Sequence, residues 1–448
     1  MGFWEGEKKQ GRQGELFSVS TACHLYLGID FGTSGARSAV VDAQGNIQFE
    51  GRFGFTEFAG VNLADSWKTG LFALLAQIPK KLKSRIQAIA LNGTSSTVVL
   101  CNEFGEPVAP PMLYNDARGA AVIEQLRDLV PPQHTVLNAT SSLVKLLWMS
   151  QSPSFAKARY FLHQADWLGF LLHGRLGVSD YHNALKLGYD VENLEYPQWL
   201  TELNLPISLP HIVAPGSAIA QITPQIVQDF ELSPDCLVCA GTTDSIAAFL
   251  ASGAKYVGEA VTSLGSTLAV KLLSHTRIED ARYGIYSHRF PSFNSEKVET
   301  PFWLVGGASN TGGAVLKHFF SNTELNHLSQ EINLKQPSKL DYYPLLKPGE
   351  RFPINDPQLS PRLEPRPQSH VEFLHGLLTG IAKIEAQGYE LLQKLGADKL
   401  NHVYTAGGGA NNLTWLAIRQ QYLQVPVETS RNTEAAYGSA LLAMKSQI

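Results

Sequence analysis

Apolar residues run almost without interruption over residues 25–31, a pattern typical of a strand buried on both faces. Asp30 breaks this run, and the tight-turn sequence Gly32-Thr33-Ser34-Gly35 follows directly. Two more strand patterns, at 36–41 and 47–53, complete a predicted antiparallel meander. A buried carboxylate is costly unless a partner neutralises it, so Asp30 indicates a nearby cation.

The alternation of elements continues along the chain and predicts an α/β fold in two similar halves. Helical periodicity over Trp67–Ile78 precedes a buried strand pattern at Ile86–Leu91. The opening plan recurs at Ala260–Leu273, as strand, small-residue turn and strand, and helical periodicity at Val371–Leu395 precedes a strand at His402–Thr405. Two such domains would leave a cleft between them.

Composition and charge narrow the class of protein. With 448 residues, 44% of them apolar, the chain is long enough for two domains with large cores. The net charge is −4 and no basic block stands out, so no nucleic-acid partner is expected. No apolar stretch reaches bilayer length, which predicts a soluble protein without a membrane partner. Residues 1–23 are polar and aperiodic, and we expect a flexible tail there.

The pair Cys236 and Cys239 has the spacing of a metal motif but lies in a strand pattern. Residues three apart on a strand point to opposite faces, and no second Cys or His pair follows at zinc spacing. Core packing is therefore the prediction for both cysteines.

Two glycine hairpins, Gly32–Gly35 and Gly265–Thr267, have the character of phosphate-binding turns. Their backbone N–H groups can converge on anionic oxygens where no Cβ blocks approach, although neither hairpin is a Walker A or a dinucleotide motif. The strand pattern ending at Asp244 delivers a second carboxylate. Ligands of α/β folds bind beyond the carboxyl ends of strands, so Asp30 and Asp244 could meet across the cleft. Locally, Asp244 as a simple helix cap is an equal alternative.

A third turn, Gly407-Gly408-Gly409, leads from a strand pattern into a helix that contains Trp415. Bare glycine backbone can lie against a flat base, Asn412 can bond to it, and Trp415 can form a pocket wall. A helix cap with a core tryptophan is the alternative for these two residues.

Five motifs in order resemble the FGGY carbohydrate kinases over about residues 24–445. They are Asp30-Phe-Gly-Thr-Ser-Gly-Ala-Arg37, Gly241-Thr-Thr-Asp244, Ser263-Leu-Gly-Ser-Thr267, Gly407-Gly-Gly-Ala-Asn-Asn412 and Thr433-Glu-Ala-Ala-Tyr-Gly-Ser-Ala440. The resemblance implies the actin-like ATPase fold, with two ribonuclease-H-like domains around a central cleft. It implies a sugar-binding N-terminal domain over 24–251, completed by 425–448, and an ATP-binding C-terminal domain over 252–424.

The same resemblance implies roles in ATP-dependent phosphorylation of a sugar. Asp244 would be the general base, with Asp30 and Thr33 also catalytic, and Asp30 and Asp244 would hold Mg²⁺. The substrate-binding residues would be Asp30, Ser34, Gly35, Ala36, Arg37, Ser95 and Asp244. The ATP-binding residues would be Thr33, Gly265, Ser266, Thr267, Asn310, Gly408, Gly409, Ala410, Asn411, Asn412 and Trp415. For Arg37 and Ser95, a solvated surface arginine and a plain turn serine are the alternatives.

The sugar is predicted from departures within the family pattern. Bacterial xylulose kinases usually carry Gly-Gln-x-His-Gly where this chain has Gly93-Thr-Ser-Ser-Thr97, and Trp-x-Asp-x-Arg becomes Tyr114-Asn-Asp-Ala-Arg118. These departures, with Gln164–Leu168, Ser179–Tyr189 and Ala240–Gly253, resemble the plant and cyanobacterial branch often labelled xylulose kinase-1. That branch is associated with phosphorylation of D-ribulose at its 5-hydroxyl.

The leading prediction is therefore a D-ribulose kinase, with a D-xylulose kinase as the alternative. A chaperone-like or actin-like ATPase switch and a catalytically idle sugar sensor are alternatives of other classes. His182, Asn183 and Lys186 lie on a predicted helix and are not included in the site. The sequence leaves open the oligomeric state and the choice between plastid stroma and cytoplasm.

Overall fold

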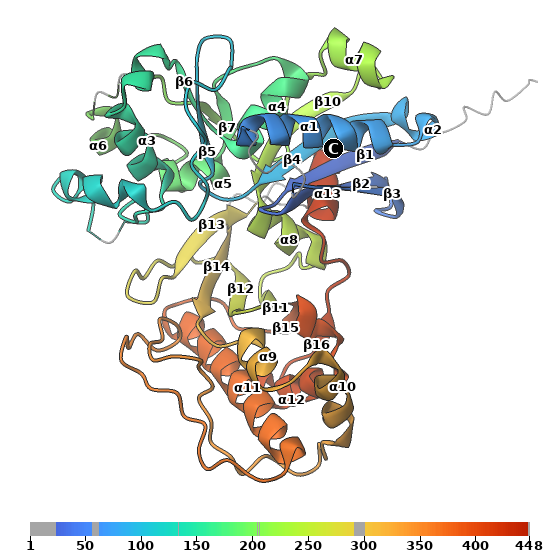
Figure 1. Cartoon of the computed structure of the whole chain (residues 1–448), viewed down its shortest axis with the longest axis vertical. Helices are drawn as coiled ribbons and strands as arrows, with labels where there is room; N and C mark the ends of the chain where they lie inside the picture. The colour runs from blue at the N-terminus through green and yellow to red at the C-terminus, as the bar shows by residue number, and fades with distance from the viewer. Residues whose placement is uncertain are drawn as a thin grey trace, which may run out of the picture.

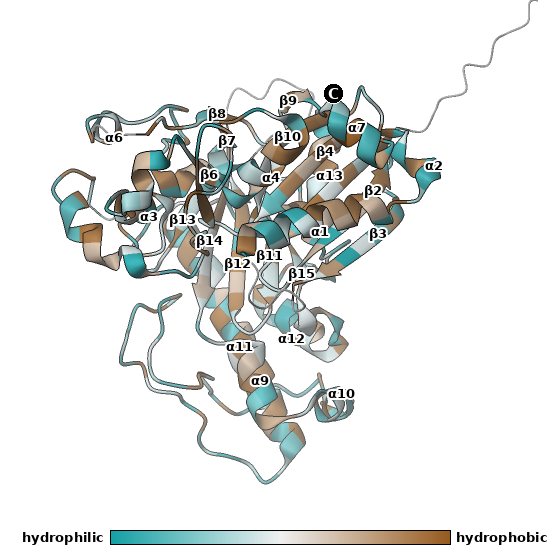
Figure 2. Cartoon of the chain, turned by 45° about the horizontal axis from the view of Figure 1, so that its top comes forward, coloured by the Kyte–Doolittle hydropathy of each residue, from teal (hydrophilic) through white to brown (hydrophobic). Residues whose placement is uncertain are grey.

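The computed structural model describes residues 24–55, 62–132, 134–203, 205, 207–290 and 301–446; the predicted tail at 1–23 lies outside them. Two six-stranded mixed sheets lie one in the upper half and one near the middle of the long axis of the molecule, with α9 to α12 around and below the second (Figure 1). Figure 2 shows apolar residues concentrated along the central strands, whereas the short rim helix α2 (Lys80–Lys83) is mostly hydrophilic. No helix in the described part is long and apolar enough to cross a membrane.

The first sheet has the order β3-β2-β1-β4-β10-β9. Its strands are β1 (Leu25–Phe31), β2 (Gly35–Asp42), β3 (Ile47–Gly54), β4 (Ile86–Gly93), β9 (Ala218–Gln221) and β10 (Leu237–Thr243). The predicted meander is confirmed, because β2 pairs antiparallel with both β1 and β3. Strands β1 and β10 pair parallel with the two sides of β4, so all three deliver their carboxyl ends to one edge.

The second sheet has the order β13-β14-β12-β11-β15-β16 and the same central plan. Its strands are β11 (Glu259–Leu264), β12 (Leu268–Ser274), β13 (Tyr286–Phe290), β14 (Phe302–Ser309), β15 (His402–Ala406) and β16 (Val427–Thr429). Strand β11 pairs antiparallel with β12 and parallel with β15, as β1 does with β2 and β4. The predicted internal repeat is therefore present.

The remaining elements cover the sheets or form an insertion at the top of the first half (Figure 1). The larger helices are α1 (Leu63–Gln77), α3 (Ser142–Ser150), α4 (Gln164–His173), α8 (Asp244–Ser252), α10 (Asn322–Glu331), α11 (His370–Lys394), α12 (Leu413–Leu423) and α13 (Ala435–Lys445). Shorter helices are α5 (Tyr181–Ala184), α6 (Gln198–Thr201), α7 (Pro224–Phe230) and α9 (Gly313–Phe319). Two small sheets pair β5 (Val98–Cys101) with β6 (Tyr160–His163) and β7 (Val178–Asp180) with β8 (His211–Val213).

Helices α8 and α13 lie between the two halves and join them through one apolar cluster. This cluster combines Phe249 and Tyr437 of the helices with Val261 and Leu304 of the second sheet. Helix α13 follows the second sheet in the chain but packs on the first, and it approaches β1 very closely. A Cβ at Gly28 would lie 2.0 Å from the carbonyl oxygen of Ala436, so only glycine fits there.

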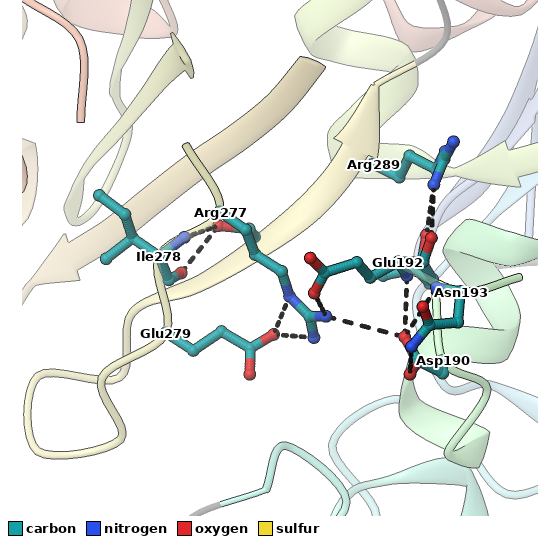
Figure 3. Close-up of polar contacts among 9 residues, drawn as sticks. Asp190, Glu192, Asn193, Arg277, Ile278, Glu279 and Arg289 are labelled. Atoms are coloured by element: carbon teal, nitrogen blue, oxygen red, sulfur yellow. Dashed lines mark hydrogen bonds and ion pairs between the residues drawn. The ribbon is translucent and has the colours of Figure 1, made fainter. Parts of the chain in front are cut away.

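An ionic cluster also joins the two halves on the β13 side (Figure 3). Arg277 lies 2.8 Å from a carboxylate oxygen of Glu192 and 2.5 Å from one of Glu279. Arg289 donates to the carbonyl oxygens of Val191 and Glu192, at 3.0 Å each. The 190–193 turn of the first half is therefore fixed to the segment that leads into β13.

The two cysteines of the Cys-x-x-Cys pair are both buried. Cys236 belongs to the apolar cluster under α1, and Cys239 to the cluster shared with α8 and α13. They therefore face opposite sides of β10, and the prediction of core packing is confirmed.

A buried ion pair connects the second sheet with its covering helices. Arg419 of α12 donates to both carboxylate oxygens of Glu385 of α11, at 2.6 and 2.7 Å, and also to the Thr405 hydroxyl. The hydroxyl of Thr262 in β11 donates to the same carboxylate. Both side chains of the ion pair are almost fully buried. Because Thr262 and Thr405 lie just before the turns that follow β11 and β15, the pair supports the strands that carry those turns.

We expect Arg419→Met to lower the free energy of unfolding by about 3–5 kcal/mol, because it leaves the Glu385 carboxylate buried without a counter-charge. Urea unfolding measures this loss. The matched control is Arg127→Met, which removes an exposed ion pair with Glu124 and should leave the urea midpoint nearly unchanged. Equal midpoint shifts for the two variants would contradict the structural role of the buried pair.

Candidate active site

The two candidate carboxylates lie at the same edge of the first sheet. Asp30 is next to last in β1 and pairs in register with Asn92, while Thr243, the last residue of β10, pairs with Gly93. Asp244 follows at once as the first residue of α8. The structure thus brings Asp30 and Asp244, which are more than 200 positions apart in the chain, to neighbouring positions on either side of β4.

The environment of Asp30 opposes its ionisation. Burial, followed by repulsion from Asp244 and Glu434, raises the pKa of Asp30 to about 7. Arg37, whose guanidinium lies 3.5 Å from the Asp30 carboxylate, acts in the opposite direction. Arg37 also lies 3.3 Å from Glu434, so it is shared between two acids.

The Asp244 carboxylate accepts a hydrogen bond and is also a weaker acid than a free aspartate. Burial raises the pKa of Asp244, and the hydrogen bond from the Ser245 N–H, at 2.6 Å, together with the charges of Lys271 and Lys186, opposes this shift. The carboxylates of Asp30 and Asp244 are therefore both poorly hydrated, and the charge of Asp244 repels that of Asp30. Two such carboxylates, with the hydroxyls of Thr33 and Ser34 nearby in the chain, provide the oxygen ligands that hard divalent cations prefer. Asp30 and Asp244 could therefore hold a divalent cation, which would supply positive charge between them.

The first hairpin places its polar tip in the open. The Gly32 N–H donates to the Gly35 carbonyl at 3.0 Å and closes the turn, and Thr33 and Ser34 are exposed at its tip. Gly35 begins β2. The side chain of Ala36 packs instead in the core at 1% exposure, so any contact of Ala36 with a ligand would have to use its backbone.

The second hairpin has the same form and lies in the second sheet. Ser266 and Thr267 are exposed at the tip between β11 and β12, and the Gly265 carbonyl accepts from Gly313 N–H at 2.9 Å. A Cβ at Gly312 would lie 2.7 Å from the Thr267 backbone, so the β14–α9 turn lies directly against this hairpin. Asn310 directly follows β14 and is exposed. Its side chain donates to the Gly349 carbonyl at 3.0 Å.

The glycine turn after β15 is open to a flat ligand at its centre. Gly407 has a left-handed backbone with φ +83°, and a Cβ at Gly408 would meet nothing within 4 Å. Asn411 is exposed at the edge of this turn.

The predicted side-chain contacts of this turn lie underneath it. The Asn412 side chain caps α12 by accepting from Trp415 N–H at 2.9 Å and donates to the Ser329 hydroxyl. Ala410 is buried, and Trp415 is 1% exposed in the core of the second half. The helix-cap and core-tryptophan alternatives therefore describe the local geometry of Asn412 and Trp415. The exposed apolar side chain beside the turn is instead Leu413, at 76% exposure.

The loop that departs from the bacterial pattern turns most of its polar groups inward. Thr94 donates its N–H to Gln164 at 3.0 Å, and the Lys145 ammonium donates to the Ser96 carbonyl at 2.7 Å. Within residues 94–97, only Ser95 is partly exposed. Ser95 is thus the side chain of this loop that a ligand could reach.

Two cavities have cationic residues in their lining, and neither Asp30 nor Asp244 lines either of them. A cavity of about 640 Å³ is lined by Lys186 and Arg351, and one of about 330 Å³ by Lys271, Ser245 and Arg351. Sequence reasoning missed Lys271 and excluded Lys186. The signal for Lys271 is a lone charge inside the apolar strand Leu268–Ser274, which is the signal that identified Asp30.

The two sheets share one plan, and each carries a glycine hairpin. This is the fold of the actin-like ATPase class, with two ribonuclease-H-like domains, and the predicted fold class is confirmed. Residues 25–251 match the FGGY family of carbohydrate kinases, N-terminal domain, and residues 260–446 match the C-terminal domain of the same family. The chain therefore belongs to the FGGY family of carbohydrate kinases. It is accordingly an ATP-dependent carbohydrate kinase.

Individual relatives are distant but similar over nearly the whole chain. The xylulose kinase of Staphylococcus epidermidis is 22% identical over 445 residues, which is 94% of this chain and 87% of that protein. The crystal structure of xylulose kinase from Rhodospirillum rubrum has a TM-score of 0.79 at 20% identity, covering 94% of this chain and 89% of that one. Plasmodium falciparum glycerol kinase with ADP has the same TM-score at 18% identity, covering the same shares. The plant and cyanobacterial branch remains a prediction.

The raised pKa of Asp30 predicts how the stability of the protein depends on pH. Its folded-state pKa of about 7 lies above the ordinary value of 3.8, so between these pH values the folded protein binds more protons and loses stability as the pH rises. We expect Asp30→Asn to stabilise the protein at about pH 8.5 by an amount on the order of a few kcal/mol, and far less at about pH 4.5.

Urea unfolding at the two pH values measures this difference. The control is Asp235→Asn, an exposed position, whose effect should be the same at both. If Asp30→Asn gave a pH-independent shift, the buried charge would not be the cause.

Proposed function

We propose that the protein transfers the γ-phosphoryl group of ATP to the terminal hydroxyl of a pentulose. The observation that carries this proposal is the meeting of Asp30 and Asp244 at one sheet edge, with a glycine hairpin in each sheet for the phosphates. A cavity of about 330 Å³ lined by Ser245, which follows Asp244 in the chain, gives room for a small ligand.

In this proposal Asp244 is the general base. Its carboxylate accepts the proton of the acceptor hydroxyl while that oxygen attacks the γ-phosphorus, and the β–γ bridging oxygen leaves with ADP. The raised pKa of Asp244 suits this role, because burial makes the carboxylate a stronger base than one in water. Ser95 and Arg37 would hold sugar oxygens, and Ser34 with Thr33 would meet the transferred group.

Mg²⁺ is the proposed metal, held by Asp30 and Asp244. Bound with ATP, it would neutralise phosphate charge, the contribution that metal ions make in phosphoryl transfer. The second hairpin, Gly265 to Thr267, would hold the nucleotide phosphates, and the turn around Gly408 would take the adenine. In that arrangement Asn412 and Trp415 would shape this turn from beneath.

Two pentuloses are candidates for the acceptor. The names of the relatives support D-xylulose and give it stronger backing than D-ribulose has. D-Ribulose is supported by the 93–97 loop, which lacks the Gln and His typical of bacterial xylulose kinases and offers Ser95 alone. We retain D-ribulose as the first acceptor to test, because a contact residue distinguishes sugars more directly than overall identity of about 20%, as for the Rhodospirillum enzyme.

Asp244→Ala should reduce kcat for sugar-dependent ADP release by about 10²-fold to 10⁴-fold, the usual contribution of a general base. A coupled ADP assay measures the rate, and circular dichroism checks that the variant is folded. Asp235→Ala is the matched control and should keep wild-type activity. Retained turnover in a folded Asp244→Ala variant would remove Asp244 from this role.

The acceptor is identified by kcat/KM for D-ribulose and D-xylulose under identical conditions. We expect D-ribulose to be preferred by about 10-fold or more, since pentuloses that differ in the direction of one hydroxyl differ in the hydrogen bonds they can make. A clear preference for D-xylulose would assign the protein to that alternative.

A further inference from the structure

Lys271 connects the second sheet to the segment that carries Asp244. It lies in the middle of β12, and its ammonium group donates to the Ser245 carbonyl at 2.7 Å. Ser245 is the second residue of α8, which directly follows β10 of the first sheet. This hydrogen bond therefore joins the two halves at the residue next to the proposed base.

Two hydrogen bonds connect Lys271 with the Asp244 carboxylate through Ser245. The peptide unit between Asp244 and Ser245 supplies the N–H that donates to the Asp244 carboxylate at 2.6 Å, and Lys271 holds the Ser245 carbonyl on the other side of that residue. The direction of the Asp244 carboxylate thus depends on a backbone segment that Lys271 fixes from the opposite sheet.

The charge of Lys271 is also poorly compensated. Among the described residues it has no carboxylate oxygen within 4 Å, and its hydrogen-bond acceptor is a neutral carbonyl. Burial lowers the pKa of Lys271 to about 8, against the opposing influence of Asp244. Lys271 and Asp244 influence each other's pKa across the two halves.

Other charged or titratable groups face this pair from several elements. The charge of Lys186, in the turn after α5, influences the pKa values of both Lys271 and Asp244. Besides burial, the charge of Lys271 lowers the pKa values of His288 in β13 and His182 in α5. Asp30 of β1 is repelled by Asp244. Both histidines have lowered pKa values because they are buried, so they are neutral near pH 7. Lys271 and Lys186 are therefore the cations that favour an ionised Asp244.

We propose that Lys271 is a positioning residue for phosphoryl transfer, which holds the Asp244–Ser245 segment in place from the second sheet. The proposal rests on the function proposed above, in which Asp244 accepts the acceptor's proton. The position of the Asp244 carboxylate would then depend on Lys271, which the second sheet brings to the start of α8. The base and the phosphate hairpin of Ser266 are thereby tied to the same β-hairpin, β11–β12.

The test compares Lys271→Met and Lys271→Arg with wild type in the coupled ADP assay. Methionine keeps the length but removes the donor and the charge, and we expect kcat to fall about 10-fold to 100-fold with KM for ATP and sugar within about threefold. The division between kcat and KM is the readout, because a displaced base slows the transfer step and leaves substrate binding in place. Arginine keeps a hydrogen-bond donor at this position, so Lys271→Arg should restore most of the wild-type kcat.

Lys399→Met is the matched control, because Lys399 is an exposed lysine of the same half, and it should leave kcat and KM unchanged. Unchanged kcat in Lys271→Met, or a lowered kcat that Lys271→Arg does not restore, would overturn the proposal. If Lys271→Met does not fold, Lys271→Arg decides, because a folded arginine variant that has lost kcat would be equally contradictory. A wild-type protein without sugar-dependent ADP release would overturn the proposed function itself, whereas an active wild type with a fully active Lys271→Met would overturn only this inference.

Discussion

The structure depends on the cost of placing two carboxylates near each other in a poorly hydrated cleft. Asp30 lies next to last in β1 and Asp244 directly follows β10, and the parallel pairing of both strands with β4 brings the two residues to the same edge. Burial is the largest cause of the raised pKa of both groups, and each needs positive charge to remain ionised. Arg37 and Lys271 supply part of that charge, and a nucleotide-bound cation would supply the rest.

The two halves contribute different parts to one site. The first sheet supplies the carboxylates and one hairpin, and the second sheet supplies the other hairpin and the open glycine turn. Helices α8 and α13 hold the halves together, with α13 pressed on Gly28 of β1 and the ionic cluster around Arg277 fixing the β13 side. Phosphoryl transfer depends on positioning and charge neutralisation more than on covalent chemistry, and two sheets that each carry a glycine hairpin suit that requirement.

Much of this arrangement could be predicted from the sequence, because strands and tight turns leave strong local signals. The meander, the repeated hairpin and the delivery of Asp30 and Asp244 to one edge all follow from apolar runs that end in small residues. The sequence offered a helix-capping Asn412 and a core Trp415 only as an alternative and missed the inward direction of Ala36, because a motif names residues without saying which side of a turn they face. Lys271 and Glu434 were missed for another reason: their partners, Ser245 and Arg37, come from distant parts of the chain.

If Asp30 and Asp244 bind a divalent cation, ligand binding must release protons from Asp30. Calorimetric titration of Mg²⁺ with a non-hydrolysable ATP analogue at pH 7, in two buffers of different ionisation enthalpy, counts the protons released. With an Asp30 pKa of about 7, we expect this side chain to release about half a proton, and Asp30→Asn to lack this release. Equal release by wild type and Asp30→Asn would mean that the cation does not bind this carboxylate.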